Sequence, residues 1–236
     1  MHARVTHESS FAAARDEAKE IGEMPFELHI MDGNGEPYEF WEKLELRAYD
    51  NGHGYMEGIF NPGAAERDPI SREHFETLSA AYGPDRAREI LGMNRHNTVI
   101  YGSGSPHTVF QQFRVIRPIA VDRTLIEIQT FRCKGAPDGV FKRAMLYANV
   151  INSPSSNVMP DDIELYNRCQ EGNATRGGEW VSMHRYHGAD RSDADGMVSV
   201  NGTSELPMRN QFRAWKQYME AGAVAQAPAQ GEGACC

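Results

Sequence analysis

Residues 109–117, VFQQFRVIR, and residues 124–132, TLIEIQTFR, alternate between apolar and polar side chains with a period of two. This period predicts two antiparallel strands, and a turn containing Pro118 is expected to join them. We expect one face of the pair to be apolar and the other to carry Gln112, Arg114, and Glu127 or Gln129. A long pair of this kind is typical of a sheet that is covered on one side.

The flanking segments predict further strands and several helices. Asn51-Gly52 lies between two alternating runs and indicates a hairpin. Short apolar or β-branched runs predict strands at 26–31, 43–49, 55–60 and 97–101. Helix-forming composition and capping residues predict helices at 10–22, at 71–91 with Ser71 as N-cap and a break at Gly83-Pro84, at 138–150, at 161–171 and at 207–220. Helices bracketing an antiparallel sheet give an α+β fold.

Composition and charge exclude several classes of protein. The 236 residues include 33 acidic and 24 basic side chains, and the net charge of −9 argues against a nucleic-acid binder. No apolar run is long enough for a membrane span, and no export signal is recognised. The four cysteines, at 133, 169, 235 and 236, lack the spacing of a zinc or iron–sulfur site. We expect a cytoplasmic protein with one domain over residues 1–221 and a disordered tail over 222–236.

The first ten residues, MHARVTHESS, contain a pair of histidines, His2 and His7, and an acidic pair, Asp161-Asp162, follows far downstream. Two imidazoles and one carboxylate are the ligands of a mononuclear non-haem Fe(II) site. In a straight helix, residues five apart lie about 140° out of line, so both histidines reach one metal only through a π-like turn. Surface histidines near a frayed end are the alternative.

Several phrases, in this order, resemble the catalytic domain of the large (alpha) subunit of Rieske non-haem iron aromatic-ring-hydroxylating oxygenases. They are the His2/His7 pair before a helix, 51–54 (NGHG), 95–101 (RHNTVIY), 117–122 (RPIAVD), 134–138 (KGAPD), 160–162 (PDD), 169–172 (CQEG) and 207–211 (PMRNQ). The resemblance implies a curved antiparallel sheet with covering helices, the helix-grip fold of START and Bet v 1-like domains.

The resemblance also implies roles for individual residues. His2, His7 and Asp162 would bind Fe(II) as the catalytic centre, with Asp161 as the alternative carboxylate ligand or as a helix N-cap. Four further residues are expected to bind substrate: His96, Asn97, Arg114 and Val158. Arg114 could clamp an aromatic carboxylate through both nitrogens. A solvent-facing arginine is the alternative.

The implied reaction is O₂-dependent hydroxylation of an aromatic compound, in particular an aromatic carboxylate. Family members carry a [2Fe–2S] cluster on C-x-H and C-x-x-H ligands, and these ligands do not occur in the 236 residues. Electrons would come from NADH through a separate reductase or ferredoxin. A small beta subunit is a further expected partner, and the expected assembly is a homotrimer or α3β3. The missing cluster ligands lead us to expect an N-terminally truncated catalytic domain.

Two other functions fit the same residues. One is a non-catalytic ligand-binding module on the helix-grip fold, with an inactive metal site. The other is a zinc hydrolase that uses the same three ligands, although no general base stands beside the histidines in the sequence. His107, His184 and His187 are assigned no metal-binding role.

Overall fold

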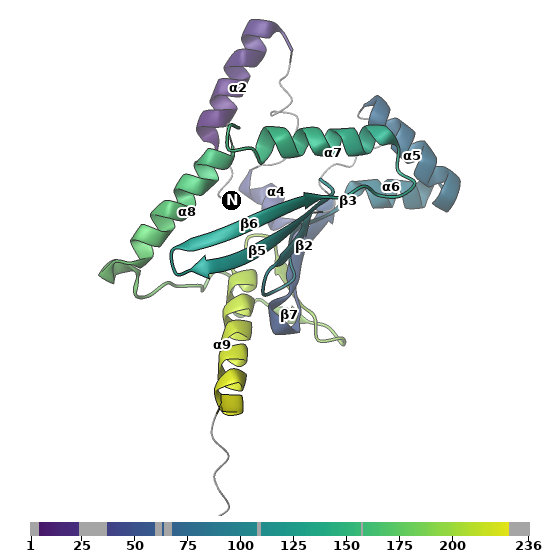
Figure 1. Cartoon of the computed structure of the whole chain (residues 1–236). Coiled ribbons are helices and arrows are strands. Elements are labelled where there is room, and N and C mark those ends of the chain that lie inside the picture. Colours follow the sequence, from purple (N-terminus) through teal and green to yellow (C-terminus); the bar gives the residue numbers. More distant parts are fainter. Residues whose placement is uncertain are drawn as a thin grey trace, which may run out of the picture.

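Two antiparallel sheets form the framework of the chain (Figure 1). A computed structural model describes residues 5–23, 37–59, 63, 68–107, 110–156 and 158–226, and the strand expected at 26–31 lies outside these ranges. The larger sheet has the order β3-β2-β1-β8-β7, and the smaller has the order β4-β5-β6. The strands are β1 (Glu45–Ala48), β2 (Gly54–Ile59), β3 (Met93–Val99), β4 (Gly104–His107), β5 (Gln112–Ala120), β6 (Arg123–Thr130), β7 (Arg191–Ser192) and β8 (Val198–Asn201). With the helices described below, the α+β prediction is confirmed.

The hairpin predicted at Asn51-Gly52 joins β1 to β2. A 3-10 turn, η2 (Asp50–Gly52), connects the strands, with Asn51 at φ 62° and Gly52 at φ 84°. These left-handed conformations suit asparagine and glycine. A β-carbon on Gly52 would lie 2.6 Å from Cγ of Tyr101 and 2.9 Å from Cβ of Ala214. Glycine at this position therefore permits both the turn and the close approach of the last helix.

The strand pair β5–β6 confirms the alternation, but the turn lies elsewhere. Pro118 belongs to β5 and pairs with Thr124, so its predicted place in the turn is wrong. The amide of Ile116 donates to Ser103 O at 2.7 Å, on the side of β4. Backbone directions alternate along a strand, so the nitrogen of Pro118 points to the same side. β4 does not extend as far as Pro118, because its pairing with β5 stops at Val115. The missing N–H of Pro118 therefore costs no hydrogen bond between strands.

The register of β5 and β6 corrects the expected division of their faces. Arg114 lies opposite Ile128, whereas Glu127 lies opposite Val115. Directly opposite residues share a face, so the polar side chains are divided between both faces. Ile116, opposite Ile126, is the next residue along on the face of Arg114. Arg114 is thus a cation on a largely apolar strip.

The two sheets meet along β3 and β4. Ile100 and Gly104 exchange backbone hydrogen bonds of 2.8 and 3.0 Å just after β3. His96 on β3 and His107 on β4 pack edge to face across this junction, with ring centroids 4.8 Å apart. The sheet is therefore divided rather than continuous, and a histidine pair lies at its seam.

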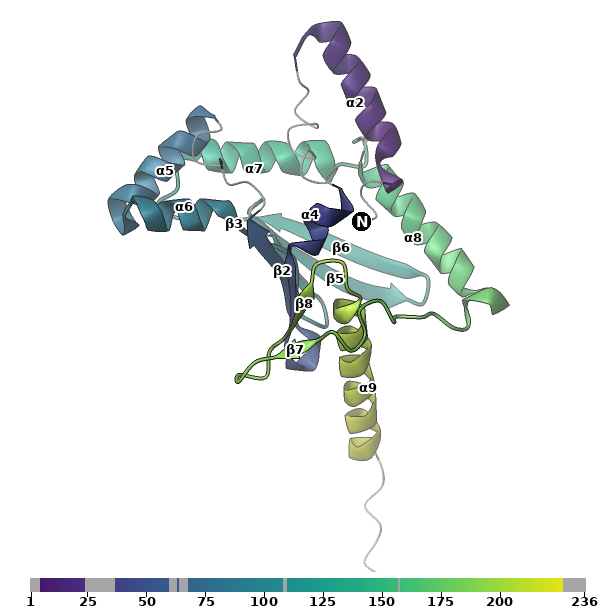
Figure 2. The same cartoon turned by 180° about the vertical axis from the view of Figure 1, so that it is seen from behind.

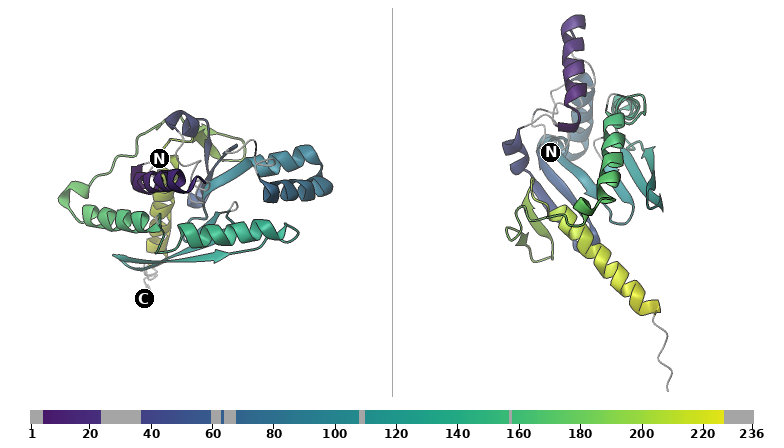
Figure 3. Two further views of the ribbon diagram at one scale, coloured as in Figure 1. Left: turned by 90° about the horizontal axis from the view of Figure 1, so that it is seen from above. Right: turned by 90° about the vertical axis from the view of Figure 1, so that its left-hand side faces the viewer.

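The helices surround these sheets (Figures 1 and 2). They are α2 (Glu8–Ile21), α4 (Tyr38–Glu42), α5 (Pro69–Tyr82), α6 (Pro84–Gly92), α7 (Asp138–Ile151), α8 (Met159–Asn173) and α9 (Leu206–Gln226), with a 3-10 turn η3 (Arg176–Gly178) after α8. Figure 3 shows α7 running along the β5–β6 pair. No helix among the described residues combines the length and apolarity needed to cross a bilayer.

Two details of these helices differ from the prediction. Asp68, not Ser71, caps α5: its carboxylate accepts from the amide of Ser71 at 2.9 Å and from the Ser71 hydroxyl at 2.8 Å. Pro69 at the first helical position fits this start. The last helix continues to Gln226, beyond the predicted end at residue 220. The break at Gly83-Pro84 is confirmed between α5 and α6.

Buried apolar residues form two clusters, one on the larger sheet and one among the helices. The first joins β1, β2 and β8 to the start of α9 through residues that include Leu46, Met56, Val200 and Leu206. The second gathers Phe11 of α2, Tyr147 and Ile151 of α7, and Val158 before α8. This second cluster joins α7 to α2 and α8, the two helices whose starts carry the predicted ligands His7 and Asp162.

Candidate active site

His7 is the centre of a buried polar group between α2 and α8. It directly precedes α2, and its side chain is only 3% exposed. Nδ1 lies 3.2 Å from Oδ2 of Asp161, and Nε2 lies 3.3 Å from Oδ1 of Asp162. The fold thus brings His7 together with both members of the acidic pair, across more than 150 residues of chain.

The start of α8 explains why two adjacent aspartates lie there. Pro160 occupies the first turn, which suits its fixed φ, and carboxylates near a helix N-terminus are stabilised by the helix dipole. Asp161 does not cap the helix, contrary to the alternative considered above. Its Oδ2 instead accepts a hydrogen bond from the Ser10 hydroxyl at 3.2 Å, besides facing His7. Asp161 therefore ties α8 to α2.

The nitrogen and oxygen atoms around His7 include possible metal ligands. When Nδ1 carries the imidazole proton and donates to Asp161, Nε2 presents a lone pair to the carboxylate of Asp162. Two acceptors at this distance are stable only with a cation, a proton or a metal ion, between them. A carboxylate on the far nitrogen is the usual partner of a metal-bound histidine.

This group supplies two donors rather than a complete site. Among the described residues, no cluster of three or more His, Cys, Asp or Glu side chains is arranged to hold a metal ion. The predicted third ligand, His2, lies outside the residues that the structure describes. The chemistry of His7 and Asp162 fits two positions of the predicted Fe(II) site, and its third position depends on His2.

The residues expected to bind substrate lie in different surroundings. Val158 is 5% exposed and packs in the apolar cluster beside the acidic pair. His96 and Asn97 of β3 line a separate cavity, and Asn97 has a φ of 49°. Arg114 is half-buried on β5. The four residues therefore do not form one contiguous wall.

A row of aromatic rings connects these surroundings. His107 packs on His96. The ring centroids of His107 and Phe110 lie 4.4 Å apart, and Phe110 stacks on Tyr147 with ring centroids 3.5 Å apart. Tyr147 belongs to the cluster that also contains Val158. Sequence reasoning did not identify Tyr147 or Phe110, because nothing in the spacing of single aromatic residues marks them as neighbours of the site.

Burial shifts the pKa values of the titratable members of this row. Burial, with the charge of Arg114, lowers the pKa of His96 to about 4. Burial, His96 and Arg114 together lower the pKa of His107 to about 2. Burial also raises the pKa of Tyr147 to about 12. At neutral pH all three side chains are therefore uncharged.

The cavity lined by His96 and Asn97 has a volume of about 300 Å³. It lies between the larger sheet and the first turn of α9, and its wall includes Trp41, Met56 and Met208. This size and mixed lining suit a small aromatic molecule. Two of the four predicted substrate-binding residues, His96 and Asn97, thus lie in the wall of one cavity.

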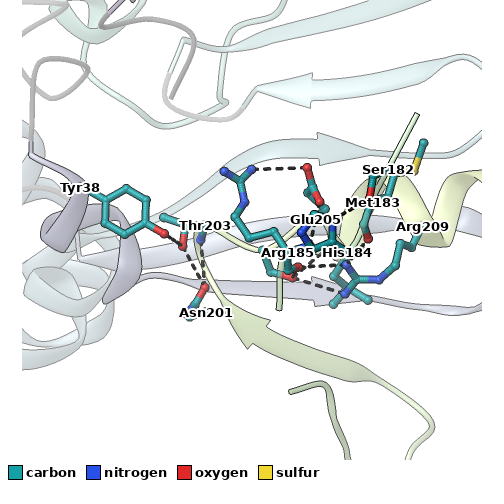
Figure 4. A network of polar contacts seen from close by, with 11 residues as sticks. Tyr38, Ser182, Met183, His184, Arg185, Asn201, Thr203, Glu205 and Arg209 are labelled. Carbon is teal, nitrogen blue, oxygen red and sulfur yellow. Dashed lines mark hydrogen bonds and ion pairs between the residues drawn. The ribbon is translucent and has the colours of Figure 1, made fainter. Parts of the chain in front are cut away.

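A polar network fixes the rim of the cavity at α9 (Figure 4). The guanidinium of Arg209 donates to the carbonyls of Met183 and Arg185, each at 3.1 Å, and pairs with Asp190 at 3.1 Å. On the other side, the Tyr38 hydroxyl donates to Thr203 at 3.0 Å. These contacts hold the irregular segment before β7 against the start of α9.

Comparison with known proteins identifies relatives by sequence and by fold. No family model matches the chain. It is 29% identical over 181 residues to the alpha subunit of toluate 1,2-dioxygenase of Pseudomonas putida, covering 73% of this chain and 39% of that protein. It is also 29% identical over 150 residues to the large subunit of 2-halobenzoate 1,2-dioxygenase of Burkholderia cepacia, covering 61% and 31% respectively.

Solved structures share the architecture. Naphthalene 1,2-dioxygenase with indole in its active site superposes with a TM-score of 0.65 at 20% identity, over 91% of this chain and 48% of that one. The indole complex of the Rhodococcus sp. enzyme gives a TM-score of 0.57 at 16% identity, over 85% and 50%. The chain spans less than two fifths of the length of the curated relatives that it matches. The sequence comparison confirms the predicted resemblance, and the solved structures show the shared fold: the chain is similar to the large (alpha) subunits of aromatic-ring dioxygenases.

Proposed function

We propose that this chain is the catalytic domain of an aromatic-ring-hydroxylating oxygenase, with His2, His7 and Asp162 as the ligands of one Fe(II) ion. The observation that carries the proposal is the buried imidazole of His7, which faces Asp161 with one nitrogen and Asp162 with the other. The relatives named above are dioxygenase subunits, and this supports the assignment. When bound, the metal would supply O₂ activation at the open coordination positions that a three-ligand site leaves.

The residues around His7 have distinct tasks in this proposal. Asp161, held by Ser10, accepts a hydrogen bond from Nδ1–H of His7. This bond fixes the orientation of the imidazole, so that Nε2 would face the metal. Asp162 provides the carboxylate ligand. Val158 and Tyr147 exclude water on the side of the apolar cluster.

The substrate class follows from the names of the relatives. Toluate and 2-halobenzoate are aromatic carboxylates, and we propose an aromatic carboxylate as the substrate of this chain. The further partners proposed are O₂ and an electron-transfer chain of NADH, a reductase or ferredoxin, and a [2Fe–2S] cluster. A beta subunit and a trimeric assembly belong to the same proposal, as does a cytoplasmic location.

Titration with Co(II), a spectroscopic substitute for Fe(II), tests the metal site. We expect one Co(II) per chain, no binding after His7→Ala or Asp162→Asn, and a tenfold to hundredfold weaker affinity after Asp161→Asn, on the order seen for outer-shell partners of metal ligands. Asp138→Asn is the matched control, because Asp138 also lies in the first turn of a helix but is exposed and pairs with Arg132.

Other outcomes would favour the other functions. Equal Co(II) affinity in the wild type and Asp162→Asn contradicts the proposed ligand set. Aromatic binding without any metal binding favours the ligand-binding module, which the 300 Å³ cavity would also serve. Ester hydrolysis that depends on Zn(II) favours the zinc hydrolase.

A further inference from the structure

Arg114 differs from every other arginine of comparable burial in the described part of the chain. Four described arginines are half-buried: Arg47, Arg114, Arg143 and Arg209. Arg47 pairs with Glu45 and Glu57, Arg143 with Asp68, and Arg209 with Asp190. Arg114 makes no ion pair within the described residues. A charge withdrawn from water without a counter-ion is costly, so its place in the fold requires an explanation.

The immediate contacts of Arg114 leave part of its hydrogen-bonding capacity unused. Nη2 donates to Oε1 of Gln112 at a long 3.4 Å, while the amide of Gln112 donates to Asn152 at 3.0 Å. Nε of Arg114 is buried and has no hydrogen-bond partner. Its neighbours on the same face are the isoleucines of β5 and β6. The guanidinium is thus held by a neutral side-chain amide on an apolar strip, and an anion would supply the acceptors that its free donors lack.

A second unused donor lies on the same face of the sheet, because His107 of β4 is opposite Gln112, two residues from Arg114. His107 is 7% exposed, and its Nδ1 is buried without a hydrogen-bond partner. The imidazole is neutral, since burial and the neighbouring charges of His96 and Arg114 lower the pKa of His107 to about 2. A neutral imidazole can carry its single proton on Nδ1 and donate it. His107 thus adds a donor without adding a second positive charge.

Electrostatic interactions relate Arg114 to the proposed metal ligand. Burial raises the pKa of Tyr147 and of Tyr166. The positive charge of Arg114 lowers the pKa of both phenols, and the negative charge of Asp162 raises it. The guanidinium and the Asp162 carboxylate therefore lie near the same two rings.

We propose that Arg114, assisted by Nδ1–H of His107, binds the carboxylate of an aromatic acid and so determines specificity for acids over neutral rings. The inference rests on the proposed function for the identity of the ligand as a substrate, while the recognition itself requires only these two side chains. A guanidinium matches a carboxylate with two parallel hydrogen bonds, and burial strengthens them.

The test compares benzoate with benzamide, which has the same shape without the charge, by calorimetric titration of the metal-free full chain. The wild type is expected to bind benzoate at least about tenfold more tightly, and Arg114→Met to reduce this preference to about one while leaving benzamide binding unchanged. Arg114→Lys keeps the charge but not the planar fork, and an intermediate preference is expected. Arg123→Met, at an exposed arginine of the paired strand β6, is the matched control.

The outcomes separate this inference from the proposed function. A folded wild type that binds both ligands equally, or binds neither, overturns the inference, as does an undiminished preference in Arg114→Met. If Arg114→Met does not fold, the wild type and Arg114→Lys still decide. A wild type that binds no Co(II) but prefers benzoate to benzamide contradicts the proposed oxygenase and supports the carboxylate site.

Discussion

At the scale of single residues, His96 and His107 show how burial determines the protonation of a side chain. Both lie at the seam of the two sheets, and their pKa values of about 4 and about 2 are well below the ordinary 6.5. The unfolded chain binds protons at these positions as the pH falls below 6.5, whereas the folded chain does not. Their contribution to stability is therefore complete above that pH and declines as the pH falls towards the folded values.

Replacing His107 by glutamine should make stability less dependent on pH. One such histidine contributes a slope approaching about 1.4 kcal/mol per pH unit below its unfolded pKa. Urea unfolding between pH 7 and pH 5 is expected to show a shallower decline for His107→Gln than for the wild type. His184→Gln, at an exposed histidine, should retain the wild-type slope. The same slope in all three proteins would contradict a neutral, buried His107.

The sequence identified only part of this site. His7 and the acidic pair were found through the resemblance of ordered phrases, and the fold brings these residues together. Arg114 was named as a candidate, but its burial could not be read from an alternating strand, because either face can point inward. His107 follows a proline in a short strand and has no partner in the sequence, so its role became visible only in three dimensions.

At the scale of elements, the Gly52 turn controls how closely α9 approaches the larger sheet. Asn210 of α9 donates to the carbonyls of Tyr49 and His53 on either side of this turn, at 2.9 and 3.1 Å. Tyr101, at the end of β3, covers the turn from another direction. The hairpin was predictable because Asn-Gly marks such turns, whereas its contact with a helix more than 150 residues away was not.

Alanine at Gly52 should destabilise the chain by about 2–6 kcal/mol. About 1–3 kcal/mol comes from the positive φ, and overpacking against Tyr101 and Ala214 adds a similar amount. Chemical denaturation followed by circular dichroism measures the loss. Gly222→Ala is the control: it lies within α9 with nothing near its added methyl group, and a gain of up to about 1 kcal/mol is expected there. Equal effects at both glycines would refute the close approach.

At the scale of the whole molecule, α2 and α8 are joined through His7 and the acidic pair. A metal bound there would link the beginning of the described chain to a helix that follows the strands of the smaller sheet. Because a ligand that binds only the folded state stabilises it, the proposed site has a thermodynamic signature that is independent of catalysis.

Co(II) at a hundred times its dissociation constant should stabilise the wild type by about 2.7 kcal/mol. Thermal unfolding with and without the metal measures this as a rise in the transition temperature. The rise should disappear in Asp162→Asn and persist in Asp138→Asn. A metal-dependent rise of the same size in Asp162→Asn would place the bound ion elsewhere.

The two sheets belong to different parts of the proposed site. The helices around His7 and Asp162 share the second apolar cluster, while the cavity is built from the larger sheet and α9. Substitutions of cavity-wall residues outside the row of rings that begins at His96, such as Trp41 or Met208, are expected to leave the anchorage of the acidic pair intact. Descendants of one ancestral chain can therefore diverge in the molecules they accept while the opposite half of the scaffold is inherited unchanged.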